Sequence, residues 1–148
     1  MTDDSHSTPL LPGQSVLVVD DVGVVRKAVF RFLSEEGFRV FEAASAGEAL
    51  EVLSTARPPV RLVITDVIMP DVNGVDVARL IREEWPATRV IFMSAYPAEV
   101  LAREGLDNLD VVFLAKPFTR DELITKVGAA LRLPKRDGEE LRTGSPTT

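Results

Sequence analysis

Apolar and polar residues alternate along this chain in two periods, which predict short strands separated by longer helices. Five apolar runs bounded by turn or polar residues are predicted strands: "SVLVVD" (15–20), "FRVFEAA" (38–44), "RLVITD" (61–66), "RVIFMS" (89–94) and "VVFLAK" (111–116). Five stretches with apolar residues at helical spacing are predicted helices: 24–37, 46–56, 74–85, 97–105 and 119–133. The last helix opens on a capping box formed by Thr119 and Glu122.

The order of these elements predicts the fold class. Strands that alternate strictly with helices and are apolar almost throughout are typical of a parallel sheet covered by helices on both faces. The chain has 148 residues, 45% of them hydrophobic, which is enough for one domain with a core. Its two ends are rich in Ser, Thr, Pro, Gly and charge, so we expect flexible tails at 1–13 and 134–148 around a single domain at 14–133.

Composition narrows the function classes. With 17 basic and 23 acidic residues the formal charge is -6, which opposes direct binding to nucleic acid or an anionic membrane and favours a cation. The absence of cysteine excludes disulfides, zinc-thiolate sites and cysteine nucleophiles. No apolar run approaches the roughly 20 residues of a membrane helix, and the first residues lack the pattern of a secretory signal. We therefore expect a cytoplasmic protein.

Polar side chains follow four of the five predicted strands. Asp20 and Asp21 end the first strand, Asp66 ends the third, Ser94 ends the fourth and Lys116 follows the fifth. The carboxyl ends of parallel strands share one edge of the sheet, so these side chains should meet there. Three carboxylates without a neighbouring His or Cys favour Mg²⁺ or Mn²⁺, and an added lysine and hydroxyl provide donors for an anion. This combination is typical of phosphoryl transfer.

Four stretches, "VLVVDD", "LVITDVIMPDVNG", "VIFMSA" and "VFLAKPF", resemble the receiver domain of two-component response regulators in their order and spacing. The resemblance covers roughly Ser15 to Leu133. It implies a flavodoxin-like (βα)5 doubly wound sheet with strand order 2-1-3-4-5. It also implies a signalling phosphoacceptor rather than an enzyme, which receives phosphate from a histidine kinase or histidine phosphotransfer protein and switches a surface for a downstream protein.

The resemblance assigns roles at the strand ends. Asp66 would accept the phosphoryl group, and Mg²⁺ or Mn²⁺ would be held by Asp20, Asp21, Asp66 and the backbone carbonyl of Ile68, with Asp20 acting mainly through a metal-bound water. Lys116 would pair with Asp66 and then with a phosphoryl oxygen.

Three further residues take part in the switch that the resemblance implies. Ser94 would bind another phosphoryl oxygen, and Phe113 would turn inward as Ser94 moves. Pro117 would follow a cis peptide bond.

Two bulky residues are expected to tune the lifetime of the phosphorylated form. Ile68 and Tyr96, two residues beyond Asp66 and Ser94, occupy positions that in this family control the access of water to phosphorus. Neither side chain is an acid or carboxamide that orients an attacking water, so we expect slow self-dephosphorylation.

Other interpretations remain open at this point. A strand-end Asp is commonly only a helix cap, and a strand aromatic such as Phe113 usually packs in a core. A receiver segment of a hybrid histidine kinase fits the same motifs, although Met1 and the short final segment favour an independent single-domain protein. Formation of a homodimer is also open.

Three further classes of protein are less favoured. A phosphatase of the haloacid dehalogenase type needs a second Asp where Ile68 stands, and a flavin binder would suffer repulsion between its phosphate and Asp20 and Asp21. A degenerate receiver that acts only as a scaffold is disfavoured by the complete Asp, Ser and Lys set.

Overall fold

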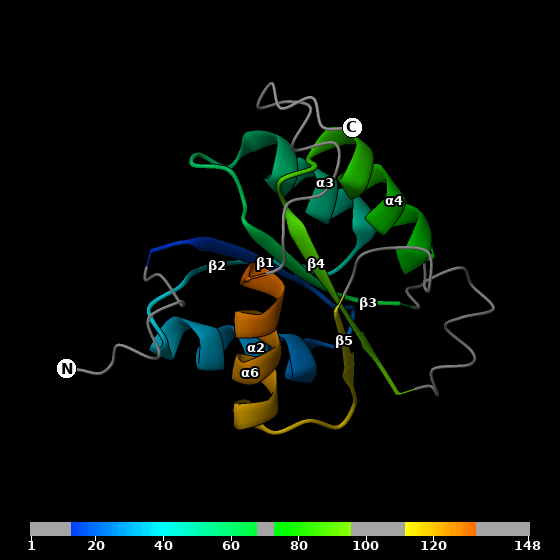
Figure 1. The fold of residues 1–148 in the computed structure, drawn as a ribbon. Coiled ribbons are helices and arrows are strands. Elements are labelled where there is room, and N and C mark those ends of the chain that lie inside the picture. Colours follow the sequence, from blue (N-terminus) through cyan, green and yellow to red (C-terminus); the bar gives the residue numbers. More distant parts are fainter. Residues whose placement is uncertain (1–12, 68–72, 96–111, 133–148) are drawn as a thin grey trace.

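The computed structural model describes residues 13–67, 73–95 and 112–132 as a parallel sheet covered by helices (Figure 1). The strands are β1 (Ser15–Val19), β2 (Arg39–Ala43), β3 (Leu62–Asp66), β4 (Arg89–Ser94) and β5 (Val112–Ala115), in the order β2-β1-β3-β4-β5. The described helices are α2 (Gly23–Glu35), α3 (Ala46–Thr55), α4 (Gly74–Glu84) and α6 (Arg120–Leu131). The predicted strands, the strand order and four of the predicted helices are confirmed. The helix predicted at 97–105 and most of the two predicted tails lie outside the described residues.

Helices pack on both faces of the sheet because successive strand residues point to opposite sides. On one face the apolar side chains of the sheet meet α2 and α6, and this cluster includes Val16, Val18, Val29, Leu33, Leu123 and Val127. On the other face they meet α3 and α4, and this cluster includes Leu17, Val19, Ala49, Leu53, Ala78 and Ile81. Figure 1 shows the two helix pairs on opposite sides of the strands. The near-continuous apolar strands of the sequence are thus explained by burial on both faces.

Local sequence signals place the helix ends. The predicted capping box is present, with Thr119 accepting from the Glu122 amide and the Glu122 carboxylate accepting from the Thr119 amide. Gly37 lies at φ 95 just beyond α2, a conformation that glycine adopts without strain. The four described helices fall short of the length and apolar content that a membrane crossing requires.

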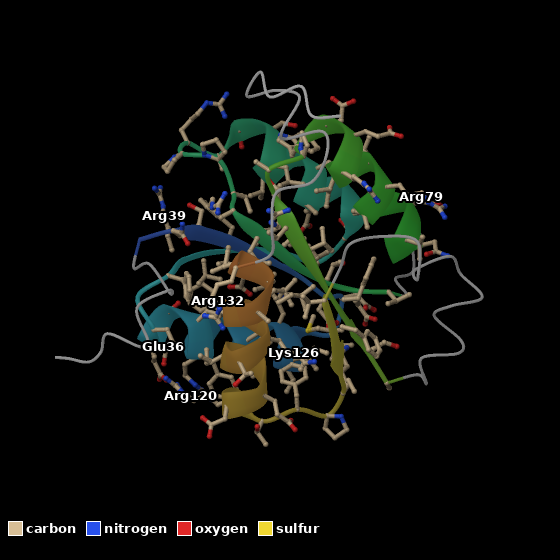
Figure 2. All side chains as sticks on the ribbon, in the orientation of Figure 1. Glu36, Arg39, Arg79, Arg120, Lys126 and Arg132 are labelled. Carbon is tan, nitrogen blue, oxygen red and sulfur yellow. The ribbon has the colours of Figure 1, made fainter. Side chains whose placement is uncertain are left out.

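An ion-pair cluster joins the two helices that cover one face. Arg120, at the start of α6, lies beside Glu36 at the end of α2 (Figure 2). Its guanidinium nitrogens donate to Glu35 at 2.7 Å and to Glu36 at 2.6 Å. These hydrogen bonds, to Glu35 first and then to Glu36, raise the pKa of Arg120. The contact fixes the start of α6, which follows closely after Lys116 and Pro117 at the end of β5.

Gly74 brings α4 unusually close to the end of β3. Its N–H donates to the Val67 carbonyl at 2.6 Å. A Cβ at this position would lie 2.5 Å from the Asp66 carbonyl oxygen and 2.7 Å from the Val67 carbonyl oxygen. The absence of a side chain is therefore required for the helix to begin directly against the residues that carry the strand-end carboxylate.

Candidate functional site

Three carboxylates meet where β1 and β3 end. One oxygen from each of Asp20, Asp21 and Asp66 lies within 4.8 Å of the others. Asp20 is fully buried, Asp21 is exposed and Asp66 is partly exposed. An all-oxygen donor set that is open to solvent on one side fits the coordination of Mg²⁺, which keeps several water ligands. The cluster is thus compatible with Mg²⁺.

Lys116 bridges two of these carboxylates. Its Nζ donates to Asp20 Oδ2 at 2.9 Å and to Asp66 Oδ2 at 3.1 Å. Burial alone would lower the pKa of Lys116, but the hydrogen bonds to Asp20 and Asp66 outweigh burial and the pKa is raised. The ammonium group therefore stays charged and offsets part of the negative charge. We call these four residues, Asp20, Asp21, Asp66 and Lys116, the acidic rim site.

Asp20 is held rigidly from both its side chain and its backbone. The Val22 N–H donates to Asp20 Oδ1 at 2.8 Å, and Arg26 donates from its guanidinium to the Asp20 carbonyl at 2.7 Å. Arg26 is itself oriented by Glu42, whose carboxylate accepts from Arg26 Nε at 3.0 Å. Neither Arg26 nor Glu42 was predicted from the sequence, because charged residues on a helix and on an edge strand usually face solvent. Their contact depends on the pairing of β1 with β2 and on how α2 packs there.

Glu42 is the anion that pairs with Arg26. It also accepts from Lys27 Nζ at 3.0 Å. Burial would raise the pKa of Glu42, but the hydrogen bonds from Lys27 and Arg26 outweigh burial and the pKa is lowered. Glu42 therefore remains an anion that orients the Arg26 guanidinium toward the Asp20 backbone.

Ser94 and Pro117 directly adjoin Lys116, and Phe113 lies on β5, three residues before Lys116. Ser94 ends β4, is 1% exposed, and its carbonyl accepts from the Lys116 amide at 2.8 Å. Phe113 lies on β5 opposite Phe92 in register and is partly buried against the cluster under α3 and α4. The peptide bond between Lys116 and Pro117 is cis. Ile68 and Tyr96 lie outside the described residues.

An apolar pocket adjoins the site on the side of α2. It has a volume of about 510 Å³ and is lined by Val24, Phe32, Pro117 and Phe118, together with Lys116. Val22 and Val24 are 47% and 81% exposed, and they are the exposed large hydrophobic residues within the described chain. Val24 also lines the pocket, so an exposed apolar side chain and Lys116 share this part of the surface.

The sheet order and the acidic rim site define a class, that of doubly wound α/β proteins with their polar site at the carboxyl ends of the strands. Comparison with known families narrows this class further. The family model for the response regulator receiver domain matches residues 16–128, and the chain belongs to that family.

Individual relatives agree with this assignment. The chain is 36% identical over 121 residues to the sensor kinase CckA of Brucella abortus, a match covering 82% of this chain and 13% of that protein. It is 34% identical over 125 residues to the response regulator MprA of Mycobacterium ulcerans, covering 84% and 53% of the two chains. The chemotaxis protein CheY4 of Vibrio cholerae has a similar structure, with a TM-score of 0.72 and 27% identity, covering 80% and 98%. The chain spans about half or less of the length of the first curated relatives it matches.

Proposed function

We propose that this protein accepts a phosphoryl group on Asp66 from a phosphohistidine of a histidine kinase or a histidine phosphotransfer protein. The observation that carries the proposal is the acidic rim site, in which three carboxylates lie within 4.8 Å of one another and Lys116 bridges Asp20 and Asp66. Membership of the receiver family and the similarity to a sensor kinase and to response regulators support the same reaction.

Of the two carboxylates that Lys116 bridges, Asp66 is the better suited to attack phosphorus. Its side chain is 16% exposed, whereas that of Asp20 is fully buried and committed to Lys116 and to the Val22 amide. A carboxylate oxygen of Asp66 forms the new P–O bond while the P–N bond to the donor imidazole breaks. The imidazole keeps the electron pair of that bond and takes up a proton from solvent. The product is an acyl phosphate on Asp66.

The other residues of the site neutralise charge and hold positions. Mg²⁺ or Mn²⁺ would be held by Asp20, Asp21 and Asp66, together with the Ile68 carbonyl, and when bound supplies positive charge next to the phosphoryl oxygens. Lys116 releases Asp66 and pairs with a phosphoryl oxygen, remaining charged because its pKa is raised. Arg26 keeps the Asp20 backbone in place during this exchange.

The output passes through β4 and β5. The Ser94 hydroxyl moves to bind a phosphoryl oxygen, and Phe113 follows it inward, which changes the surface next to β5. The ends of β4 and β5 are directly connected, because the Ser94 carbonyl accepts a hydrogen bond from the Lys116 amide. A downstream protein reads the changed surface.

The phosphoryl donor docks on the apolar pocket beside α2. The pocket includes Lys116 in its lining, so a protein bound there brings its histidine close to Asp66. The 81% exposed Val24 provides an apolar contact that a small-molecule phosphodonor does not need.

The expected lifetime of the acyl phosphate on Asp66 is long. If the Ile68 side chain excludes water from the phosphorus atom, Ile68→Ala should shorten the half-life of the acyl phosphate.

Intact-protein mass spectrometry after incubation with acetyl phosphate and Mg²⁺ tests the assignment of Asp66. We expect a single phosphoryl adduct that disappears in Asp66→Asn and when the metal is removed by chelation. Asp76→Asn is the matched control, since Asp76 is an exposed carboxylate on α4 that pairs with Arg79 and is not one of the three clustered carboxylates. An adduct that persists in Asp66→Asn would disprove the assignment. No adduct in any condition, with the fold and Mg²⁺ binding intact, would favour a scaffold that functions without phosphorylation.

A further inference from the structure

A second pocket lies at the opposite end of the sheet from the acidic rim site. It has a volume of about 700 Å³ and is lined by residues around the amino-terminal ends of three strands: Ser15 at the start of β1, Arg61 before β3 and Thr88 before β4. We call it the amino-terminal pocket. A volume of this size accommodates a small organic ligand. The proposed phosphorylation chemistry does not use any of these residues.

Most of the pocket wall is apolar and stiff. Trp85, which follows α4, supplies a partly buried aromatic ring, and Pro58, Pro59 and Pro86 supply ring carbons without backbone N–H groups. These residues lose little conformational freedom when a ligand binds, because their backbone or ring is already fixed. The wall therefore suits a flat apolar group.

Two buried polar atoms at this pocket have no hydrogen-bond partner within the described residues. They are Ser15 Oγ and Arg61 Nε, and Ser15 is only 1% exposed. Nearby polar groups are satisfied, since Thr88 Oγ1 donates to the Val60 carbonyl at 2.7 Å and the Arg61 amide donates to the Ser15 carbonyl at 2.8 Å. Buried polar groups are usually paired, and leaving one unpaired costs about 1–3 kcal/mol. Ser15 Oγ and Arg61 Nε are therefore left with unmet hydrogen-bonding capacity among the described residues.

The charge of the pocket indicates which acceptor fits. Arg61 is the single charged residue among the described residues that line the pocket. An arginine guanidinium presents several donors in one plane, which match a carboxylate. The Ser15 hydroxyl is able to donate to the same anion. One guanidinium carries one positive charge, which balances a single carboxylate.

We propose that the amino-terminal pocket binds a small organic monocarboxylate, with its carboxylate on Arg61 and Ser15 Oγ and its flat apolar body against Trp85 and the prolines. This site is independent of the phosphoacceptor role proposed for Asp66, and the ligand would act at the far end of the same strands. Trp85 makes the proposal directly measurable, because it is the single tryptophan of the chain.

Titration of the full chain with 4-phenylbutyrate, followed by Trp85 fluorescence and by calorimetry, tests the proposal. We expect saturable one-to-one binding with a Kd of about 1 mM or lower. The amide 4-phenylbutyramide has the same shape without the charge and should bind about tenfold more weakly. Equal binding of the acid and the amide, or no saturable binding of the acid, would overturn the proposal. Both ligands are compared on the wild-type protein, so this result does not depend on the folding of a variant.

Three variants separate a ligand site from a structural role. Arg61→Met keeps the aliphatic stem and should weaken 4-phenylbutyrate binding about tenfold, whereas Arg79→Met, at an exposed arginine on α4 (Figure 2), should not. Ser15→Ala should weaken binding about fivefold without lowering the free energy of unfolding, because this hydroxyl has no partner to lose in the part of the chain that the structure describes. Wild-type affinity in both Arg61→Met and Ser15→Ala would contradict the assignment. The urea unfolding midpoint of each variant verifies that it is folded.

Discussion

Gly74→Ala should displace the backbone that carries Asp66 and so distort the acidic rim site, although it changes none of the charged side chains of that site. The added Cβ would lie 2.5 Å from the Asp66 carbonyl oxygen, 2.7 Å from the Val67 carbonyl oxygen and 2.9 Å from the Val67 Cα. All three are backbone atoms, so no side-chain rotation relieves the overlap. Either α4 or the end of β3 must move by at least about 0.5 Å.

The overlap at Gly74 is expected to lower both the stability of the protein and its affinity for Mg²⁺. Overpacking of this kind typically costs about 1–3 kcal/mol, so we expect the free energy of unfolding to fall by about 2 kcal/mol. The displaced residue, Asp66, is also one of the three clustered carboxylates. A misplaced ligand weakens metal binding by roughly tenfold or more, so the affinity for Mg²⁺ should fall together with stability.

Urea unfolding and calorimetric titration with Mg²⁺ measure the two effects. Gly47→Ala is the matched control, because its added Cβ would meet only Ser45 Oγ, at 4.0 Å. Gly47 lies near the start of α3, where alanine should leave stability unchanged or raise it by up to about 1 kcal/mol. A Gly74→Ala variant with wild-type stability and wild-type Mg²⁺ affinity would refute the argument that the close approach of α4 positions Asp66.

Three other perturbations probe the contacts around the site. Lys116→Met leaves buried Asp20 without its cation, so the metal-free free energy of unfolding should fall by about 2 kcal/mol, and Mg²⁺ should recover more stability than in the wild type. Urea unfolding with and without Mg²⁺ decides this, and an equal Mg²⁺ effect in both proteins would contradict it. The pKa of Glu42 is lowered from 4.5, so its stabilising contribution is complete above that value and is lost as the pH falls through the lower folded pKa. Glu42→Gln should therefore be less stable than the wild type near neutral pH, with a difference that vanishes in acid; a pH-independent difference would argue against the ion pair. Val24→Asp should slow phosphorylation by a phosphohistidine protein about tenfold and leave the rate with acetyl phosphate unchanged. Equal slowing with both donors would place the effect at Asp66 instead of at the docking surface.

The sequence alone determined the elements and their order. Neighbouring strand residues such as Val16 and Leu17 are both apolar although they face opposite sides of the sheet, and this continuous pattern predicted strands buried on two faces. The helical spacing of apolar residues and the Thr119 capping box predicted the described helices. These signals are local, because each depends only on residues within one short stretch of the chain.

The sequence also indicated which residues meet at the rim, through a topological rule. The ends of parallel strands share one edge, so strand-end positions were sufficient to group Asp20, Asp66 and Lys116. The rule did not tell which atoms pair. The bridge from Lys116 to Asp20 joins residues 96 positions apart, and no periodic pattern records a contact of that kind.

Only the tertiary structure decided the contacts that depend on packing between elements. Arg26 and Glu42 are ordinary charged residues in sequence, and they become supports for Asp20 because α2 lies against β1 and β2. The amino-terminal pocket likewise exists because the segments before β3 and β4 bring Arg61 and Trp85 together near Ser15. Hydrophobic periodicity specifies which side of an element is buried, whereas polar contacts between distant segments depend on the angles and register with which those buried sides pack.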